Sequence, residues 1–170
     1  MFIRLEELKL HRISFSKTYP EGALDYRTSD FQQAGDLKVE GVAELAGVEI
    51  HLRGRLTTRV VATCDRCLDS VEMPVETDFD LFYRPESTIA REEDVEISPA
   101  ELEVGFYTGD GIELADVVTE QVNLFMPMKV VCRAECKGLC PVCRKNLNRG
   151  ECQCAPQPLH DSPFASLLDD

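Results

Sequence analysis

The sequence contains no long run of apolar residues. No stretch approaches the roughly 18 apolar residues of a membrane span, so the chain is not expected to cross a membrane. At the N-terminus, Glu6 and Glu7 stand where a secretory signal peptide would carry its apolar segment. We therefore expect a cytoplasmic protein.

The motifs of common enzyme classes are also missing. There is no Walker phosphate loop, no Rossmann glycine fingerprint and no nucleophile elbow. The three histidines, His11, His51 and His160, lack metal-ligand spacing, and none begins the His-x-Glu element of a zinc deaminase. The sequence therefore favours a non-catalytic binding protein, and we expect no small-molecule substrate.

Positive charge is scarce over most of the chain. The 18 lysines and arginines stand against 31 acidic residues, and the net charge of -13 repels nucleic acid and anionic lipid at long range. Between residues 129 and 149, however, six bases accompany one acid. The six are Lys129, Arg133, Lys137, Arg144, Lys145 and Arg149. They could compensate nearby metal-bound thiolates, or contact the phosphates of RNA or an acidic patch of a protein partner.

Alternating apolar and polar residues predict three strands, over 36–46, 48–64 and 71–83, arranged as an antiparallel meander. Helical spacing over 114–125, followed by a proline, predicts one amphipathic helix. The predicted fold class is therefore α+β, with an antiparallel sheet, open or curled toward a barrel, covered by this helix. Residues 1–35 are left unassigned.

Eight cysteines occur as four close pairs. A chain of 170 residues can bury a core without cross-links, and a reducing cytosol disfavours disulfides. Four thiolates suit zinc, and a site closed by four protein ligands is structural because no position is left for water. We therefore predict two zinc sites, with iron as the alternative metal. The predicted ligands are Cys64, Cys67, Cys132, Cys136, Cys140, Cys143, Cys152 and Cys154.

The spacing favours one division of these cysteines without excluding another. Cys140 and Cys143 lie close in sequence to Cys152 and Cys154, so these four can form a compact local site. The first four cysteines would then form the second site. An interleaved pairing of the middle four cysteines remains open, as do a redox-active dithiol and ordinary buried thiols.

The remaining segments complete the predicted organisation. Seven acids and one base over 86–103 predict a solvated acidic loop. We expect an α+β domain over 1–128 that includes the first cysteine pair on a hairpin, a metal-binding module over 129–155, and a tail over 156–170. The segment Asn146-Leu147-Asn148 favours a turn over a binding motif.

Several motifs together resemble the bacterial YceD family. They are Cys64-Asp65-Arg66-Cys67-Leu68, Leu124-Phe125-Met126-Pro127, Cys136-Lys137-Gly138-Leu139-Cys140-Pro141-Val142-Cys143, Asn146-Leu147-Asn148 and Cys152-Gln153-Cys154. The resemblance spans 36–168 and implies metal ligation by the eight cysteines. Arg144 departs from the family pattern, which usually has glycine there, and Asp161-Ser162-Pro163-Phe164 departs at the tail.

The family resemblance implies a role in large-subunit ribosomal RNA accumulation and ribosome assembly, without a defined catalytic activity. The expected partner is a ribosomal RNA precursor or a large-subunit ribosomal protein, contacted through the basic residues. Two other hypotheses stay open. An acidic adaptor would engage ribosomal proteins through the loop at 86–103, and a thiol redox protein would use Cys64 and Cys67.

Overall fold

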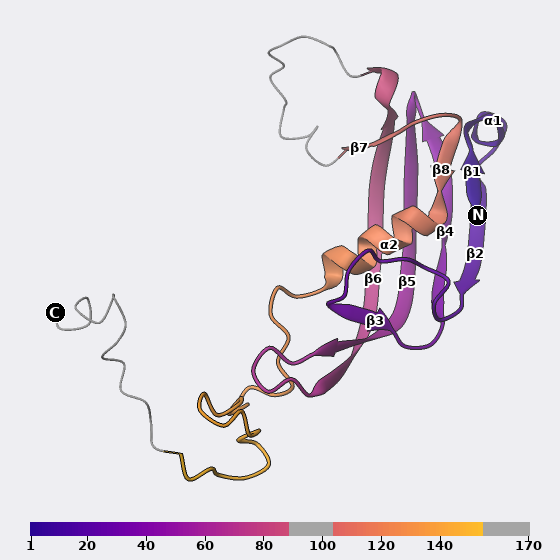
Figure 1. The fold of residues 1–170 in the computed structure, drawn as a ribbon. Coiled ribbons are helices and arrows are strands. Elements are labelled where there is room, and N and C mark those ends of the chain that lie inside the picture. The colour runs from indigo at the N-terminus through magenta and orange to yellow at the C-terminus, as the bar shows by residue number, and fades with distance from the viewer. Residues whose placement is uncertain (89–103, 155–170) are drawn as a thin grey trace, which may run out of the picture. The chain divides into compact units, whose positions relative to one another are not determined.

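The computed structural model describes residues 1–88 and 104–154 (Figure 1). Strands are the commonest regular structure in this part of the chain, which also has two α-helices and one short 3-10 helix. The elements in chain order are β1 (Phe2–Arg4), α1 (Leu5–Leu8), β2 (Ile13–Tyr19), β3 (Phe31–Gln33), β4 (Leu37–Ala46), β5 (Glu49–Thr63), β6 (Ser70–Pro85), η1 (Glu86–Thr88), β7 (Val104–Tyr107), β8 (Gly111–Glu113) and α2 (Leu114–Phe125).

The main sheet is open and has the strand order β2-β4-β5-β6-β7, with β3 paired to β5. The predicted α+β class is confirmed, with an open sheet in place of the barrel alternative. The three predicted strands correspond to β4, β5 and β6, which are neighbours in this order, whereas β7 was not predicted and pairs with β6 in parallel. A separate two-stranded sheet pairs β1 with β8, so that Ile3 lies opposite Ile112.

Alternation along β5 separates a buried face from an exposed face of the sheet. Ile50, Leu52 and Leu56 are fully buried, whereas Arg53 and Arg55 between them are exposed. The helix α2 crosses the sheet in Figure 1 and buries its own apolar stripe. This stripe consists of Leu114, Val117, Val118 and Val122. The predicted helix at 114–125 therefore has the predicted bounds and most of the predicted buried face, although Phe125 at its end is exposed.

A glycine pair allows β4 and β5 to pack closely against aromatic rings. Gly41 lies directly opposite Gly54. A Cβ atom on Gly54 would lie 2.5 Å from the carbonyl oxygen of Glu40 and 2.6 Å from the Cζ atom of Phe79. Since one contact is with backbone, a side chain at position 54 cannot be accommodated without moving the strands.

We therefore expect Gly54→Ala to lower the free energy of unfolding by about 2–3 kcal/mol, as overpacking does in other cores. Urea denaturation followed by circular dichroism would measure the change. Gly47→Asn, in the turn between β4 and β5, is the matched control because no atom lies within 4 Å of its added Cβ and asparagine tolerates the φ of +67°. Equal stability of the two variants would contradict the packing argument.

Contacts divide the chain into two compact units. Unit 1 comprises Met1–Ala62 and Glu72–Met128, and contains the sheet and α2. Unit 2 comprises Thr63–Val71 and Lys129–Asp170, of which 155–170 lie outside the described residues. The domain limits predicted from the sequence stay a prediction, and most of the predicted acidic loop, 89–103, also lies outside the described residues.

In the described part of the chain, no helix has both the length and the apolar character needed to cross a membrane.

Candidate metal centre

The eight cysteines gather into two groups of four within unit 2. Cluster 1 contains Cys64, Cys67, Cys132 and Cys136, and cluster 2 contains Cys140, Cys143, Cys152 and Cys154. Within each cluster the four Sγ atoms all lie within 4.8 Å of one another. The structure therefore has the division that the sequence spacing favours, and not the interleaved one.

One cysteine pair in each cluster is presented by the same kind of turn. In cluster 1, the backbone N–H of Leu68 donates to the carbonyl oxygen of Cys64 at 2.9 Å, and Leu68 has a φ of +62°. In cluster 2, the N–H of Arg144 donates to the carbonyl oxygen of Cys140 at 2.9 Å, and Arg144 has a φ of +59°. Each turn thus ends with a residue in the left-handed conformation and brings its two sulfurs together.

The departure of Arg144 from the family pattern falls on this left-handed position. Because a Cβ atom disfavours that conformation by about 1 kcal/mol, we expect Arg144→Gly to tighten metal binding at cluster 2 by up to about fivefold. Competition with a chromophoric chelator would measure the affinity. Arg144→Ala is the control, since it removes the guanidinium and keeps the Cβ atom. If the glycine and alanine variants bind metal equally, backbone strain at this position does not limit affinity.

Cluster 1 has the spacing of a tetrahedral thiolate site. Four sulfurs each about 2.3 Å from one zinc ion would lie about 3.8 Å apart. The Sγ atoms of Cys64 and Cys136 are 3.9 Å apart, and those of Cys67 and Cys132 are 3.7 Å apart. These pairs join the turn between β5 and β6 to the segment that follows α2. The donor set and its spacing therefore fit zinc.

N–H groups surround the buried sulfurs of cluster 1. Burial would raise the pKa of the Cys64 thiol, but N–H groups from the backbone at Cys132, Arg66 and Cys67 lower that pKa to about 6. The N–H of Cys132 lies 3.3 Å from the Cys64 sulfur. Burial also opposes ionisation of Cys136, whose pKa is nevertheless lowered by the side-chain amide of Asn148 and the N–H of Gly138. Such donors favour thiolates, the form that binds metal.

Cluster 2 is more open to solvent than cluster 1. Cys140 is buried, Cys143 is exposed, and the other two cysteines are intermediate. The backbone N–H groups of Cys143 and Val142 lower the pKa of Cys140 to about 6. With four thiol ligands, either cluster would be closed around its ion, as structural zinc sites are. That the eight cysteines ligate metal stays a prediction.

Sequence reasoning missed the part that asparagine plays beside cluster 1. The turn predicted at 146–148 is present, because the N–H of Arg149 donates to the carbonyl oxygen of Asn146 at 3.1 Å. In addition, the side-chain amide of Asn148 lies 3.3 Å from the sulfur of Cys136. Only the position of this motif, between two cysteine pairs, could have suggested such a contact.

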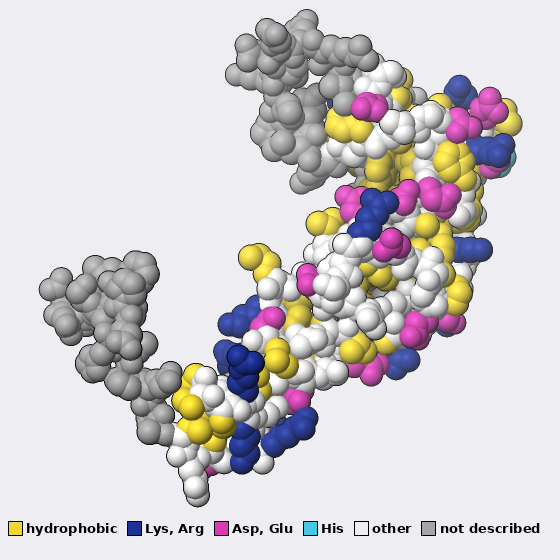
Figure 2. Space-filling view, viewed as in Figure 1, with side chains coloured by type: hydrophobic (Ala, Val, Ile, Leu, Met, Phe, Trp, Pro, Cys, Tyr) yellow, Lys and Arg dark blue, Asp and Glu magenta, His cyan; other side chains and the backbone are white. Residues whose placement is uncertain are grey.

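The six basic residues singled out in the sequence are all exposed, but they have different surroundings. Arg149 forms an ion pair with Asp69 at 2.7 Å, and Lys145 donates to the carbonyl oxygen of Glu151 at 2.9 Å. The other four have no ion-pair partner among the described residues. These four, named here the free cations, are Lys129, Arg133, Lys137 and Arg144. Figure 2 shows lysine and arginine side chains gathered around the segment that carries them.

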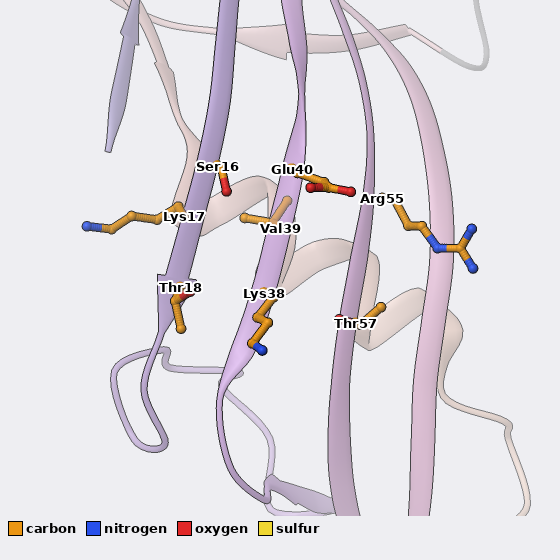
Figure 3. Close-up of a pocket in the computed structure, with 8 residues that line it drawn as sticks. All are labelled: Ser16, Lys17, Thr18, Lys38, Val39, Glu40, Arg55 and Thr57. Carbon is orange, nitrogen blue, oxygen red and sulfur yellow. The ribbon is translucent and has the colours of Figure 1, made fainter.

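A depression on the exposed face of the main sheet is a weaker candidate for binding an anion. It has a volume of about 210 Å³ and lies over β2, β4 and β5 (Figure 3). Its basic side chains do not converge, since Lys17 and Arg55 are directed to opposite sides (Figure 3). Arg55 also forms ion pairs with Glu76 and Asp78. We therefore place the candidate site in unit 2.

Comparison with known proteins gives one family. The model described as "Large ribosomal RNA subunit accumulation protein YceD" matches residues 52–169. The uncharacterized protein Rv2926c of Mycobacterium tuberculosis is 38% identical over 109 residues, covering 64% of this chain and 48% of the relative. The uncharacterized protein YlbN of Bacillus subtilis is 23% identical over 140 residues, covering 81% and 76%. The chain spans about half the length of its mycobacterial relative. No solved structure gives a significant match.

Proposed function

Because this chain belongs to the family of the large ribosomal RNA subunit accumulation protein YceD, we propose that it is a non-catalytic cytoplasmic factor that binds ribosomal RNA. In this proposal two zinc ions, one in each cysteine cluster, hold the fold of unit 2. The free cations then contact the phosphates of large-subunit ribosomal RNA or its precursor. Binding of this kind would support accumulation of the RNA during ribosome assembly.

One observation carries the proposal. Among the described residues, the free cations form no ion pair with an acidic residue and no hydrogen bond to a cysteine sulfur. A zinc ion with four thiolates has a formal charge of -2, which nearby cations could offset. Among the described residues, however, the hydrogen bonds to the sulfurs come from backbone N–H groups, from Asn148 and from other cysteines. No lysine or arginine in that part of the chain donates to a cysteine sulfur. The free cations are therefore available to a partner.

The proposed role of zinc is mechanical. Each structural ion would supply folding free energy on the order of 10 kcal/mol, and this would fix the positions of side chains that lie on turns. Positioned cations contact phosphates at a lower entropic cost than cations on a disordered segment. A metal-held basic surface also gives a molecule with a net charge of -13 a local way to approach RNA.

Direct binding measurements with the zinc-loaded full chain test the proposal. Fluorescence anisotropy would compare transcribed fragments of large-subunit ribosomal RNA with small-subunit fragments of equal length. We expect tighter binding to large-subunit fragments, with an affinity that falls as salt rises because phosphate contacts release counterions. Absence of binding at low salt would refute the RNA proposal. Binding instead to an isolated large-subunit ribosomal protein would identify that protein as the partner.

A further inference from the structure

The turn at 144–149 belongs to the chain segment of cluster 2, but the side chains of Asn146, Asn148 and Arg149 contact the segments that carry cluster 1. Asn148 is the first point of contact. Its side-chain N–H donates to the sulfur of Cys136 at 3.3 Å, while its side-chain oxygen accepts the backbone N–H of Lys137 at 2.9 Å. Asn148 therefore holds both the sulfur of a predicted ligand and the backbone immediately after it.

Asp69 is the second point of contact. Its carboxylate accepts hydrogen bonds from the side-chain amide of Asn146 at 2.9 Å and from Arg149 at 2.7 Å. The carbonyl oxygen of Asp69 accepts the N–H of Cys64 at 2.9 Å. Asp69 is thus fixed to the turn that carries Cys64 and Cys67. The 144–149 turn consequently contacts both chain segments from which cluster 1 is assembled.

The conformation of the same turn depends on cluster 2. It is flanked in sequence by two ligand pairs of that cluster. Its backbone accepts a hydrogen bond from the cluster 2 turn, since the N–H of Cys140 donates to the carbonyl oxygen of Lys145 at 2.9 Å. The N–H of Leu147 also donates to the carbonyl oxygen of Gly138 at 2.9 Å. A metal ion that closed cluster 2 would therefore hold Asn146 and Asn148 in place for cluster 1.

We propose that the two metal sites are coupled through Asn146, Asn148 and Asp69, so that each bound ion strengthens binding of the other. The proposal rests on metal binding by both clusters, as in the proposed function. An ion in cluster 2 removes conformational freedom from the 144–149 turn, and the hydrogen bonds to Cys136 and Asp69 then form at a lower entropic cost. Thermodynamic linkage makes the effect reciprocal.

Chelator competition on the cadmium-loaded full chain, followed by cadmium NMR, reads the two sites separately because each cluster gives its own resonance. In Cys152→Ser/Cys154→Ser we expect one bound ion, at cluster 1, with its affinity lowered by about 10- to 100-fold, as when hydrogen-bonding partners of metal ligands are removed. Asn148→Ala should keep two ions and weaken cluster 1 by a similar factor. Combining all three substitutions should weaken cluster 1 by much less than the product of the separate effects.

Gln153→Ala is the matched control, because it removes an exposed amide from the same segment. We expect it to leave cluster 1 unchanged. If cluster 1 keeps its full affinity in Cys152→Ser/Cys154→Ser, the sites are independent and the coupling is refuted, although metal binding stands. If that variant weakens cluster 1 but Asn148→Ala does not, the assigned residues are wrong. If the unaltered chain binds no metal, the coupling and the metal part of the proposed function both fail.

Discussion

Removal of zinc from the full chain should unfold unit 2 while unit 1 keeps its structure. Unit 2 has little else to hold it together. Its buried cluster consists of Cys64, Cys67 and Cys136, against which Val71 packs. Apart from the ends of β5 and β6, its described residues form turns and a single isolated bridge between Leu139 and Asn146. The predicted ligands thus form most of its core.

Without a metal ion, two unfavourable terms act on this unit. The N–H groups around Cys64 and Cys136 favour thiolates, and without an ion these two negative charges would repel each other across 3.9 Å. Ordering each residue also costs about 1–2 kcal/mol of conformational entropy, which so few buried side chains cannot offset. In the proposed function, zinc binding on the order of 10 kcal/mol per site would supply the missing stability. In unit 1, Ile50, Leu52 and Leu56 are fully buried, and we expect them to stay so without the ion.

Hydrogen exchange with mass spectrometry, before and after chelation, would measure the effect along the chain. We expect amides in 63–71 and 129–154 to lose protection and amides within β5 at 50–56 to retain it. Cys64→Ser/Cys67→Ser should lower the metal content from two ions to one and expose 63–71 and 129–136, while 140–154, which carries the cluster 2 cysteines, keeps its ion. Readdition of zinc to the chelated chain is the control for irreversible damage. Unchanged protection of unit 2 after chelation would show that metal does not stabilise it.

The sequence predicted the elements whose signal is periodic and local. The helix α2 has the predicted bounds because its apolar residues recur at helical spacing and because Pro127 follows it. The strands β4, β5 and β6 show the alternation that a sheet with one buried face imposes. The parallel pairing of β7 with β6 has no comparable local signal, and neither does the pairing of β1 with β8 across more than one hundred residues.

In the candidate site too, the local turns were predictable from the sequence and the tertiary contacts were not. The spacing within each cysteine pair indicated turns that place two sulfurs on one ion, and the left-handed conformations of Leu68 and Arg144 complete those turns. The assignment of Cys132 and Cys136 to cluster 1 depends on tertiary structure, so spacing could only favour it. The contact of Asn148 with the Cys136 sulfur likewise joins segments whose relative position spacing does not determine.

Neutralising the four free cations should abolish most RNA binding without disturbing the metal sites. The variant is Lys129→Gln/Arg133→Gln/Lys137→Gln/Arg144→Gln. If each cation contacts one phosphate of single-stranded RNA, its loss reduces the slope of log affinity against log salt by about 0.7. Four losses reduce the slope by roughly 3, and the affinity at about 0.1 M salt should fall on the order of several hundredfold. Anisotropy titrations at several salt concentrations would measure both quantities.

A second variant separates local contact from overall charge. Arg53, Arg55, Arg59 and Arg84 lie in unit 1 and each forms an ion pair with a carboxylate. Changing these four to glutamine alters the net charge by the same amount, and exposed ion pairs such as those of Arg53, Arg55 and Arg59 contribute only about 0–1 kcal/mol each to stability. We expect this control to reduce RNA affinity severalfold, because the more negative net charge of the protein repels RNA at long range. The slope of log affinity against log salt should stay nearly unchanged. If both variants lose affinity and slope equally, the free cations are not the RNA contact, because a specific surface would respond only to its own charges.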